Sequence, residues 1–583
     1  MNYAKAFSVA LVLTLPSFLP AEETQAEAIA AIRKLGGRVT LDEMAPGKPV
    51  VAVDLEDINP NDIIVGRLQG FSELRSLVLS VALIRDVGME NLKGLTKLQK
   101  LRLIGAKITD DGLKNLSGMK ELQSLDLTYA HINGPGLIHL KGLTKLEDLD
   151  LALTGISDES LLNLKGMTGL KRLSLAADDS ITNKGLEHLR GLTSLEVLDL
   201  DSTNITDEGL LHLKALKKLH NLDLGGSTKV TGDGLKHLQE LPCLRTLVLG
   251  NEILSDDVDQ LKAFPALTSV SFSANVRDDG LEHLEKMTKL ESLSFRNPYL
   301  TDKGLDHLKG LTNLRTLNLN CVPITGAGLE NLQGLTNLRT LEIYFGKLAD
   351  KDLERLKKMT HLEKLQLHSM PITDAGLEHL KDLKNLRYLD LGHDNISDKG
   401  LVHLKGLSKL CSLDLTESRL SGKGLEELKE LGNLEVLNLD YCRLHDDDLK
   451  ALSGFRKLRR LDLSRNRITD KGLEHLKGLK TLEELVLDRT KITEKGDCRV
   501  LEMAKARSSW AIQRSAIRSG RTEVGPYRAN QRLEPTGRCR PGSSRRREGP
   551  CWAGSNSSGR PGHHRWPQRV DSMASGSARL PDG

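Results

Sequence analysis

Aromatic residues are scarce in this chain, and its hydrophobic stretches are short. Phe, Trp and Tyr together make up 3% of the 583 residues, while leucine dominates the apolar set. A core with so few rings suits many thin, similar layers better than one large globule. The one long apolar run, residues 6–19, is shorter than the roughly 20 residues that a helix needs to cross a bilayer. We therefore expect no transmembrane span.

The familiar catalytic motifs are also missing. The sequence holds no HExxH, GxSxG, phosphate-binding loop or GxGxxG in a usable context. No nucleophile, general base or set of metal ligands converges in the pattern. We predict that the protein is not an enzyme and uses no cofactor.

The net charge of +4 hides two opposite regions. Residues 497–583 contain 16 Arg, one Lys and seven acidic residues, a net charge of about +10, which leaves residues 1–496 at about −6. A mildly acidic body with a basic tail lacks the clustered basic face of a nucleic-acid-binding domain. We expect no specific nucleic-acid partner.

A period of 24 residues runs through most of the chain. The unit can be written LxxLxLxxTxITDxGLxHLKGLTx, and its first Leu recurs from Leu74 to Leu482 in 17 steps that average 24.0 residues. A degenerate unit starts one period earlier, with Val50, Val53 and Leu55. One such unit cannot bury its leucines alone, whereas stacked units share one core. The pattern predicts a solenoid of about 19 repeats.

The two halves of the unit have different periods. LxL alternates, which predicts a short strand with both leucines on one side. In the second half, Leu473, Leu476 and Leu479 are three residues apart, as on one stripe of a short helix. Thr469 and Asp470 precede this helix and have the chemistry of a helix N-terminus.

Small or polar residues often occupy the position two before the repeat's Ile. They are Thr154, Thr203, Ser227, Asp394, Ser418, Cys442, Asn466 and Thr490. Their side chains can bond to turn backbone that would otherwise be buried without a partner. We interpret this polar column as structural.

The unit resembles the leucine-rich repeat, in the variant of ribonuclease-inhibitor-like and F-box-associated proteins. The signature ITDxGLxxL, as in residues 468–476, carries the resemblance, which extends over residues 50–496. Residues 36–39 (GGRV) and the N-terminal run are similar to secreted bacterial repeat proteins of planctomycete type. The family implies an α/β solenoid, a horseshoe with a parallel inner sheet and outer helices.

The N-terminus differs from the repeats. Lys5 and the apolar residues 6–19 predict a signal peptide over residues 1–21, with a buried first helix as the alternative. We therefore expect an exported protein that is periplasmic, secreted or at the cell surface. Residues 22–49 are expected to form an N-terminal cap with one amphipathic helix, residues 25–35.

The repeat pattern stops between Gly496 and Asp497, where a Leu is due. Residues 497–583 are rich in Arg, Pro, Gly and Ser, a composition that predicts disorder. Three interpretations remain open: a basic tail for anionic partners, densest at residues 545–547, a passive extension, or sequence read out of frame from near Gly496 onward.

The inner face of the predicted sheet is rich in acids. The residue between the two Leu of LxL is acidic in eight units: Asp126, Asp150, Asp199, Asp223, Glu342, Asp390, Asp414 and Asp462. Like charges on neighbouring strands repel, so a cationic or polar partner could relieve strain there. The alternative is that LDL is simply common in this family.

Aromatic residues narrow the position of a binding site. Three of the seven tyrosines fall on inner-face positions of turns 12 to 16, counted from Leu74, with two histidines beside them. The candidate ligand-binding residues are Tyr344, His368, Tyr388, Asp390, His393, Asp414 and Tyr441. Exposed aromatics on a long sheet can also be incidental.

A metal site is not expected. Nine histidines recur at one helix position: His139, His188, His212, His237, His283, His307, His379, His403 and His475. Each precedes an inward Leu, which places it on the solvated side of the outer helix. Asp440, Cys442, His445 and Asp446 are ligand types, but they span a strand edge and a helix start.

These features predict a non-enzymatic binding module of the cell envelope or exterior that recognises a protein or glycan on its concave face. A passive envelope scaffold without a defined ligand is one alternative. An F-box-like adaptor for ubiquitin transfer is another, but residues 22–49 are too short for the helix bundle it needs, and the signal peptide opposes it. A repeat fold by itself never determines a ligand.

Overall fold

The computed structural model describes residues 24–56, 60–80, 83–227, 229–272, 275–493, 496 and 511–513. The chain divides into two compact units, and every described residue belongs to the unit formed by residues 1–522 and 537–541. The predicted signal peptide and nearly all of the predicted tail lie outside the described residues. Within those residues, no helix has both the length and the apolar character needed to cross a bilayer.

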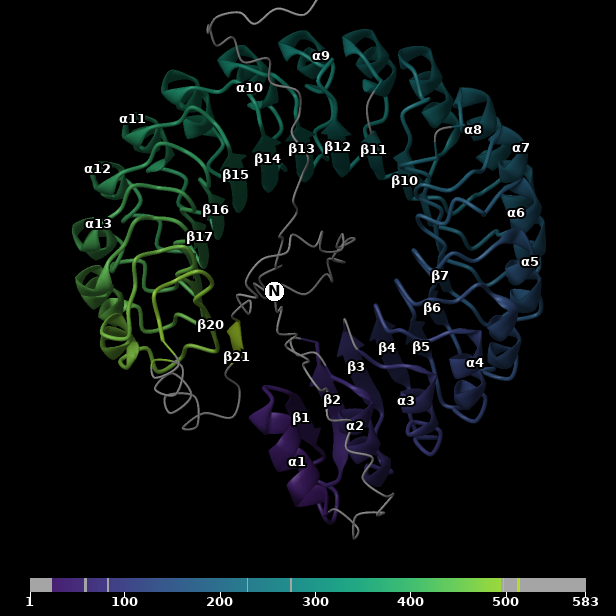
Figure 1. The fold of residues 1–583 in the computed structure, drawn as a ribbon. Coiled ribbons are helices and arrows are strands. Elements are labelled where there is room, and N and C mark those ends of the chain that lie inside the picture. Colours follow the sequence, from purple (N-terminus) through teal and green to yellow (C-terminus); the bar gives the residue numbers. More distant parts are fainter. Residues whose placement is uncertain are drawn as a thin grey trace, which may run out of the picture. The chain divides into compact units, whose positions relative to one another are not determined.

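A sheet of 21 strands runs through the described residues, with the strands along the inner side of the solenoid and the helices along the outer side (Figure 1). From β2 to β21 each strand pairs in parallel with the next in sequence, and β1 is antiparallel to β2. The strands are β1 (Arg38–Leu41), β2 (Val50–Leu55), β3 (Ser76–Ser80), β4 (Lys100–Ile104), β5 (Ser124–Asp126), β6 (Asp148–Asp150), β7 (Arg172–Ser174), β8 (Val197–Asp199), β9 (Asn221–Asp223), β10 (Thr246–Leu249), β11 (Ser269–Phe272), β12 (Ser292–Arg296), β13 (Thr316–Asn320), β14 (Thr340–Tyr344), β15 (Lys364–His368), β16 (Tyr388–Asp390), β17 (Ser412–Asp414), β18 (Val436–Asn438), β19 (Arg460–Asp462), β20 (Glu484–Val486) and β21 (Ala511–Gln513).

In each turn from β2 to β19 the second half forms a short helical segment, as its leucine spacing predicts. The α-helices are α1 (Gln25–Lys34), α2 (Asp62–Gly66), α3 (Asp86–Glu90), α4 (Asp110–Leu113), α5 (Asp158–Leu161), α6 (Asn183–Leu189), α7 (Asp207–Leu210), α8 (Gly232–Leu238), α9 (Asp302–Asp306), α10 (Gly326–Leu332), α11 (Asp374–Leu377), α12 (Asp398–Leu401) and α13 (Gly422–Glu427). The 3-10 helices are η1 (Arg67–Gly70), η2 (Lys114–Leu116), η3 (Pro135–Leu140), η4 (Leu162–Leu164), η5 (Leu211–Ala215), η6 (Ser255–Ala263), η7 (Asp278–Leu284), η8 (Asp350–Lys358), η9 (Glu378–Leu380), η10 (Asp446–Gly454) and η11 (Gly472–Leu476).

The core is one continuous stack of leucines between the sheet and the helices. Leu413 of β17 pairs with Leu389 of β16 and Leu437 of β18, so equivalent leucines lie side by side on successive turns. All three are fully buried. The parallel solenoid predicted from the 24-residue period is confirmed, with 19 strands from β2 to β20 in the expected positions.

The N-terminal helix is present where the sequence predicts it. Thr24 and Glu27 form a reciprocal capping box at the start of α1, in which the Thr24 hydroxyl accepts from the Glu27 backbone N at 3.3 Å. Ala28 and Ile32 of this helix are buried. The helix therefore turns its apolar stripe toward the first strands and leaves its charged face to solvent.

The sheet continues past the expected end of the repeats. The strand β21 pairs in parallel with β20, with Ile512 opposite Leu485. Three residues that the sequence places in the tail therefore extend the solenoid by one strand.

Seven of the eight members of the polar column bond to turn backbone, as predicted, whereas the buried hydroxyl of Ser418 has no hydrogen-bond partner among the described residues. The hydroxyl of Thr154 donates to the Leu151 carbonyl at 2.6 Å, and that of Thr203 donates to the Leu200 carbonyl at 2.8 Å. The Asn466 side-chain amide serves several backbone groups at once, including the Leu439 carbonyl at 2.7 Å. These bonds satisfy carbonyl groups that water cannot reach.

At ten junctions between successive turns of the described residues, a carboxylate also bonds one turn to the next, which the sequence did not reveal. The Asp of the ITD motif accepts a backbone and a hydroxyl hydrogen bond from the Thr or Ser one turn later. The pairs are Asp86–Thr109, Asp158–Thr182, Asp207–Thr231, Asp278–Thr301, Asp302–Thr325, Asp350–Thr373, Asp374–Ser397, Asp398–Ser421, Asp446–Thr469 and Asp470–Thr493.

Candidate functional site on the inner face

The inner face of turns 12 to 17 presents large polar and aromatic side chains. Alternation along β14 buries Leu341 and Ile343 in the core and leaves Glu342 and Tyr344 half-buried on the inner side. Tyr344 is the last residue of its strand and pairs in register with His368, the last residue of β15. The following turn residues continue this edge of the sheet.

Four rings cluster at the carboxyl ends of β14, β15 and β16. The ring centroid of His368 lies 6.0 Å from that of Tyr344, 6.4 Å from that of Phe345 and 4.7 Å from that of His393. Phe345 is 41% exposed. Three adjacent turns thus supply one aromatic and imidazole surface.

Beneath the rings lies the buried carboxylate of Asp390. It accepts hydrogen bonds from Gln366 Nε2 at 3.1 Å and the Gly392 backbone N at 2.9 Å, and its Oδ1 lies 3.3 Å from His368 Nδ1. Burial opposes ionisation, but these hydrogen bonds and the charge of protonated His368 outweigh it and lower the pKa of Asp390. A Cβ on Gly392 would meet His368 Nδ1 at 2.9 Å, so glycine leaves room for the ring to reach Asp390.

Asp414 lies next to Asp390 in the register of β16 and β17. It accepts from the Thr416 hydroxyl at 2.6 Å and from Asn438 Nδ2 at 2.8 Å, both neutral donors. Burial, followed by repulsion from Asp390, raises the pKa of Asp414 to about 6. Among the described residues, no basic side chain forms an ion pair with it.

Tyr388 is on the same face but at the other end of its strand. It begins β16, and the ammonium of Lys364 lies 5.0 Å from the centre of its ring. Lys364 also forms an ion pair with Glu342, 2.5 Å away. Burial raises the pKa of Tyr388, which is therefore a neutral phenol at any physiological pH.

Tyr441 is connected to the ring cluster by contacts through Arg465 and Glu417. Tyr441 is 51% exposed, and the guanidinium carbon of Arg465 lies 5.3 Å from the centre of its ring. Arg465 forms ion pairs with Asp440 at 2.5 Å and with Glu417 at 3.8 Å. Glu417 in turn lies 3.1 Å from His393 Nδ1.

The structure thus brings Tyr344, His368, Asp390 and His393 into direct contact and places Asp414 beside Asp390. Phe345, Glu417 and Arg465 complete the surface, and sequence reasoning missed them. All three occupy the second position after the second apolar residue of the LxL motif, where the backbone is left-handed. This edge row consists of Phe345, Ser369, His393, Glu417, Tyr441 and Arg465, with φ between 54° and 65°. Their spacing of 24 residues was the signal that could have found them.

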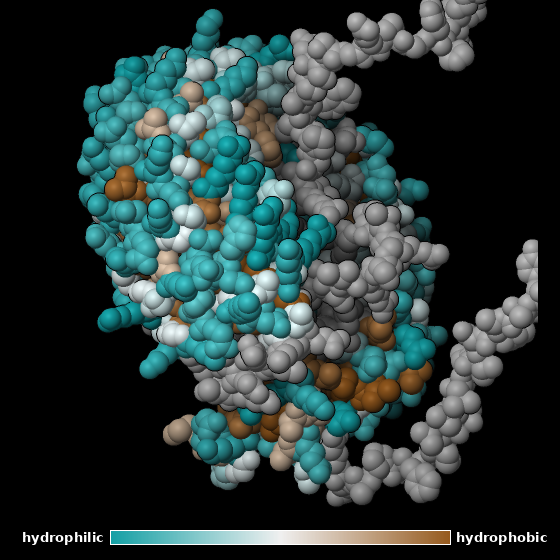
Figure 2. Space-filling view, turned by 60° about the vertical axis from the view of Figure 1, so that its left-hand side comes forward, coloured by the Kyte–Doolittle hydropathy of each residue, from teal (hydrophilic) through white to brown (hydrophobic). Residues whose placement is uncertain are grey.

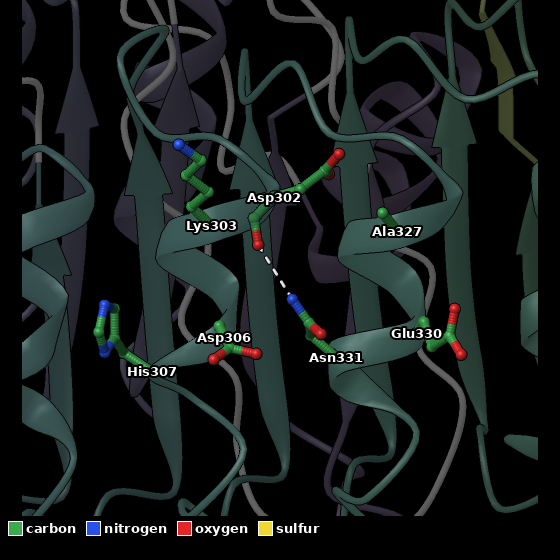
Figure 3. Close-up of a pocket in the computed structure, with 7 residues that line it drawn as sticks. All are labelled: Asp302, Lys303, Asp306, His307, Ala327, Glu330 and Asn331. Atoms are coloured by element: carbon green, nitrogen blue, oxygen red, sulfur yellow. Dashed lines mark hydrogen bonds between the residues drawn. The ribbon is translucent and has the colours of Figure 1, made fainter.

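The outer side of the solenoid offers less distinct chemistry. A groove between α9 and α10 is lined by Asp302, Lys303, Asp306, His307, Ala327, Glu330 and Asn331 (Figure 3). Most of these residue types recur at the same helix positions in other turns. Asn331 Nδ2 donates to the Asp302 carbonyl at 3.0 Å. Over the C-terminal turns the outer surface is mostly hydrophilic, with isolated apolar residues (Figure 2).

Candidate metal ligands do not assemble in the described part of the chain. No group of three or more His, Cys, Asp or Glu residues there has a geometry that could hold a metal ion. Asp440 is engaged by Arg465, Cys442 is buried, and Asp446 bonds to Thr469. The nine recurring histidines lie on the outer helical segments, where His307 Nδ1 contacts Glu285 at 2.7 Å.

Models of leucine-rich repeat families match the repeats. The leucine-rich repeat region model covers residues 180–427, and two further leucine-rich repeat models cover residues 432–492 and 142–165. The chain belongs to the leucine-rich repeat proteins. Leucine-rich repeat domains are typically non-enzymatic protein-binding modules. No curated protein matches the chain.

Several solved leucine-rich repeat structures are similar to the chain at low identity. An internalin from Listeria monocytogenes is 23% identical, with a TM-score of 0.36, over 60% of this chain and 88% of its own. TLR13 in its complex with ssRNA13 is 22% identical, with a TM-score of 0.48, over 77% of this chain and 75% of its own. A leucine-rich repeat protein of Leptospira interrogans is 20% identical, with a TM-score of 0.35, over 72% and 96%.

Proposed function

We propose that this leucine-rich repeat protein is an exported binding module that recognises a protein partner on the inner face of turns 12 to 17. The observation that carries the proposal is the contact chain from Tyr344 through His368 and His393 to Glu417 and Arg465. It spans six turns and is built from residues that differ from one turn to the next.

A binding surface needs distinct side chains held in place, and these residues meet both needs. The backbone of each is anchored by sheet pairing or by a bond to the next turn, such as that from the His393 backbone N to the Thr416 carbonyl at 2.8 Å. Tyrosine and arginine supply contact area and directional bonds, which is why they dominate binding hot spots. The outer helical segments, by contrast, repeat the same Glu, His and Lys pattern.

Export is part of the proposal and rests on Lys5 and the apolar residues 6–19. The mature protein should then begin near Glu22. N-terminal sequencing of protein recovered from the cell envelope or medium tests this. An intact Met1 in a cytosolic fraction would exclude export and favour an intracellular adaptor instead.

The binding function is tested by comparing two double variants of the full chain in affinity capture from envelope extracts. Tyr344→Ala with Tyr388→Ala removes inner-face contacts, whereas His212→Ala with His237→Ala changes the outer side. The outer variant should retain a specific partner. The inner variant should lose binding free energy for it on the order of 2 kcal/mol or more. Circular dichroism confirms that both variants are folded. Equal loss of the partner in both variants would reject an inner-face site. If neither variant changes the set of captured proteins, a passive scaffold would be favoured.

A further inference from the structure

The inner face of turns 12 to 16 has more negative than positive charge. Its inward positions and edge row carry five carboxylates, those of Glu342, Asp390, Asp414, Glu417 and Asp440. Lys364 and Arg465 are the two permanent cations that form ion pairs with members of this set. The remaining bonds to these carboxylates come from amides, hydroxyls, backbone N–H groups and imidazoles, so the carboxylates outnumber the permanent cations that pair with them.

The strongest excess of negative over positive side chains lies at Asp390 and Asp414. These two residues are neighbours in register on paired strands, and the described residues offer no Lys or Arg that forms an ion pair with either carboxylate to offset their mutual repulsion. Asp390 is already in contact with His368, so a cationic group would gain most beside Asp414. The field of such a surface also favours the approach of positively charged segments.

Tyr388 and Tyr441, aromatic residues near these carboxylates, indicate how the surface can hold a cationic side chain. Lys364 lies over Tyr388 at 5.0 Å and Arg465 over Tyr441 at 5.3 Å, so two aromatic residues of this face already hold a cation of the chain. Phe345 has the same repeat position as Tyr441 and is 41% exposed. Within the part of the chain that the structure describes, its ring contacts the imidazole of His368 and carries no Lys or Arg.

We propose that the partner bound here presents a basic extended segment, with one Arg or Lys side chain over Phe345 and a second beside Asp414 and Glu417. The inference rests on the proposed inner-face function and names the chemistry of its partner. Phe345 and Glu417 are three turns apart, about 14 Å at the spacing of paired strands. An extended segment rises about 3.3 Å per residue, so the two basic residues should be four or five positions apart.

Synthetic peptides test this specificity on the full chain. One blocked nonapeptide of Gly and Ser carries two Arg four positions apart, and its partners carry two Glu or two Gln there. Fluorescence anisotropy at 0.05 and 0.15 M salt should show binding of the Arg peptide alone, weaker at the higher salt because screening increases.

Two conservative variants locate the contacts. Phe345→Leu keeps the apolar bulk and removes the ring face, and the left-handed backbone accepts leucine, since Leu153 has φ 58° at the same repeat position. Asp414→Asn removes one charge, and Asn438 already fills that position in the next turn. Each should weaken the Arg peptide about fivefold. The matched control is Asp150→Asn, which is at the position of Asp414 in turn 4 and should change the affinity less than twofold.

Several results would overturn the inference. These are no binding of the Arg peptide, equal losses from Asp150→Asn and Asp414→Asn, or full affinity in Phe345→Leu. Binding of the Glu or Gln peptide that Tyr344→Ala abolishes would also overturn it while leaving the proposed inner-face function in place. Self-association of the chain that Phe345→Leu abolishes, seen by analytical ultracentrifugation, would assign the surface to a second copy instead.

Discussion

The carboxylate of Asp446 holds Thr469, 23 residues later, with both of its oxygens. Its Oδ1 accepts from the Thr469 backbone N at 2.7 Å and its Oδ2 accepts from the Thr469 hydroxyl at 2.6 Å. The same hydroxyl accepts from the Lys471 backbone N at 3.3 Å, in the turn that leads into η11. One Asp–Thr pair therefore joins two turns and orders the second.

Removing this carboxylate should loosen two turns without unfolding the rest. Asp446→Ala leaves the Thr469 N–H and hydroxyl without their partner and should lower the local free energy of opening of turns 16 and 17 by about 2 kcal/mol. Asp446→Asn should retain most of this free energy, because an Asn can make both bonds with the hydroxyl bond reversed: Asn183 Oδ1 accepts from the Thr206 backbone N at 2.9 Å, and Asn183 Nδ2 donates to the Thr206 hydroxyl at 2.8 Å. Hydrogen exchange by mass spectrometry, turn by turn, measures both. Similar exchange in the two variants would show that the pair has no such role.

Two glycines of one turn should respond oppositely to an added methyl group. In Gly472→Ala the new Cβ would lie 2.6 Å from Asp446 Oδ1, so the Asp446–Thr469 pair must shift, at a cost of about 1–3 kcal/mol. Gly478 has no atom within 4 Å of the same position, and Gly478→Ala should be neutral or stabilising by up to about 1 kcal/mol. Melting temperatures of both variants give the comparison. A loss from Gly478→Ala as large as that from Gly472→Ala would argue against a steric cause.

Stability should fall with rising pH because of Asp394. This carboxyl is 4% exposed, its Oδ1 accepts from the Met370 backbone N at 2.7 Å, and burial raises its pKa to about 9. The folded chain thus holds a proton that the unfolded chain releases near pH 4, and the stability this proton contributes is lost as pH rises between those values.

Asp394→Asn should remove this dependence, because an amide carries its donor at every pH and Asn466 fills the same repeat position. The variant should melt above the unmodified protein at pH 8, and the gap should narrow at pH 5. The other carboxyls with raised pKa, Asp150, Asp178, Asp223 and Asp414, are present in both proteins and cancel from the comparison. A gap that stays the same at both pH values would contradict the assignment.

Truncation should affect the last turn alone. Deleting residues 517–583 keeps β21 and should leave the circular dichroism and melting nearly unchanged. Deleting residues 497–583 removes β21 as well, so the backbone of β20 should exchange faster while the earlier turns keep their protection, because each turn contacts its neighbours only. Loss of cooperative melting in either truncation would mean that the deleted segment caps the solenoid.

The sequence by itself determined the architecture. The 24-residue period, the alternation of LxL and the three-residue leucine spacing correctly predict 19 parallel strands, the outer helical segments and the buried leucine stack. The helix α1 is also found where its amphipathic pattern predicts it, ending one residue earlier at Lys34. This succeeds because every turn contacts its sequence neighbours, so local pattern and tertiary packing carry the same information.

The tertiary structure alone decided how polar side chains meet. Tyr388 and Tyr344 both belong to the inner face, yet they lie at opposite ends of their strands, so Tyr388 takes Lys364 while Tyr344 meets His368. The edge row depends on left-handed residues whose direction no leucine pattern encodes. From the sequence, Asp446 is recognisable only as an acidic residue at the start of a helix. The structure adds that its carboxylate bonds to Thr469 of the next turn. Periodicity places a residue on a face, but short polar contacts between turns depend on backbone direction and on which rotamers the neighbouring turn leaves open.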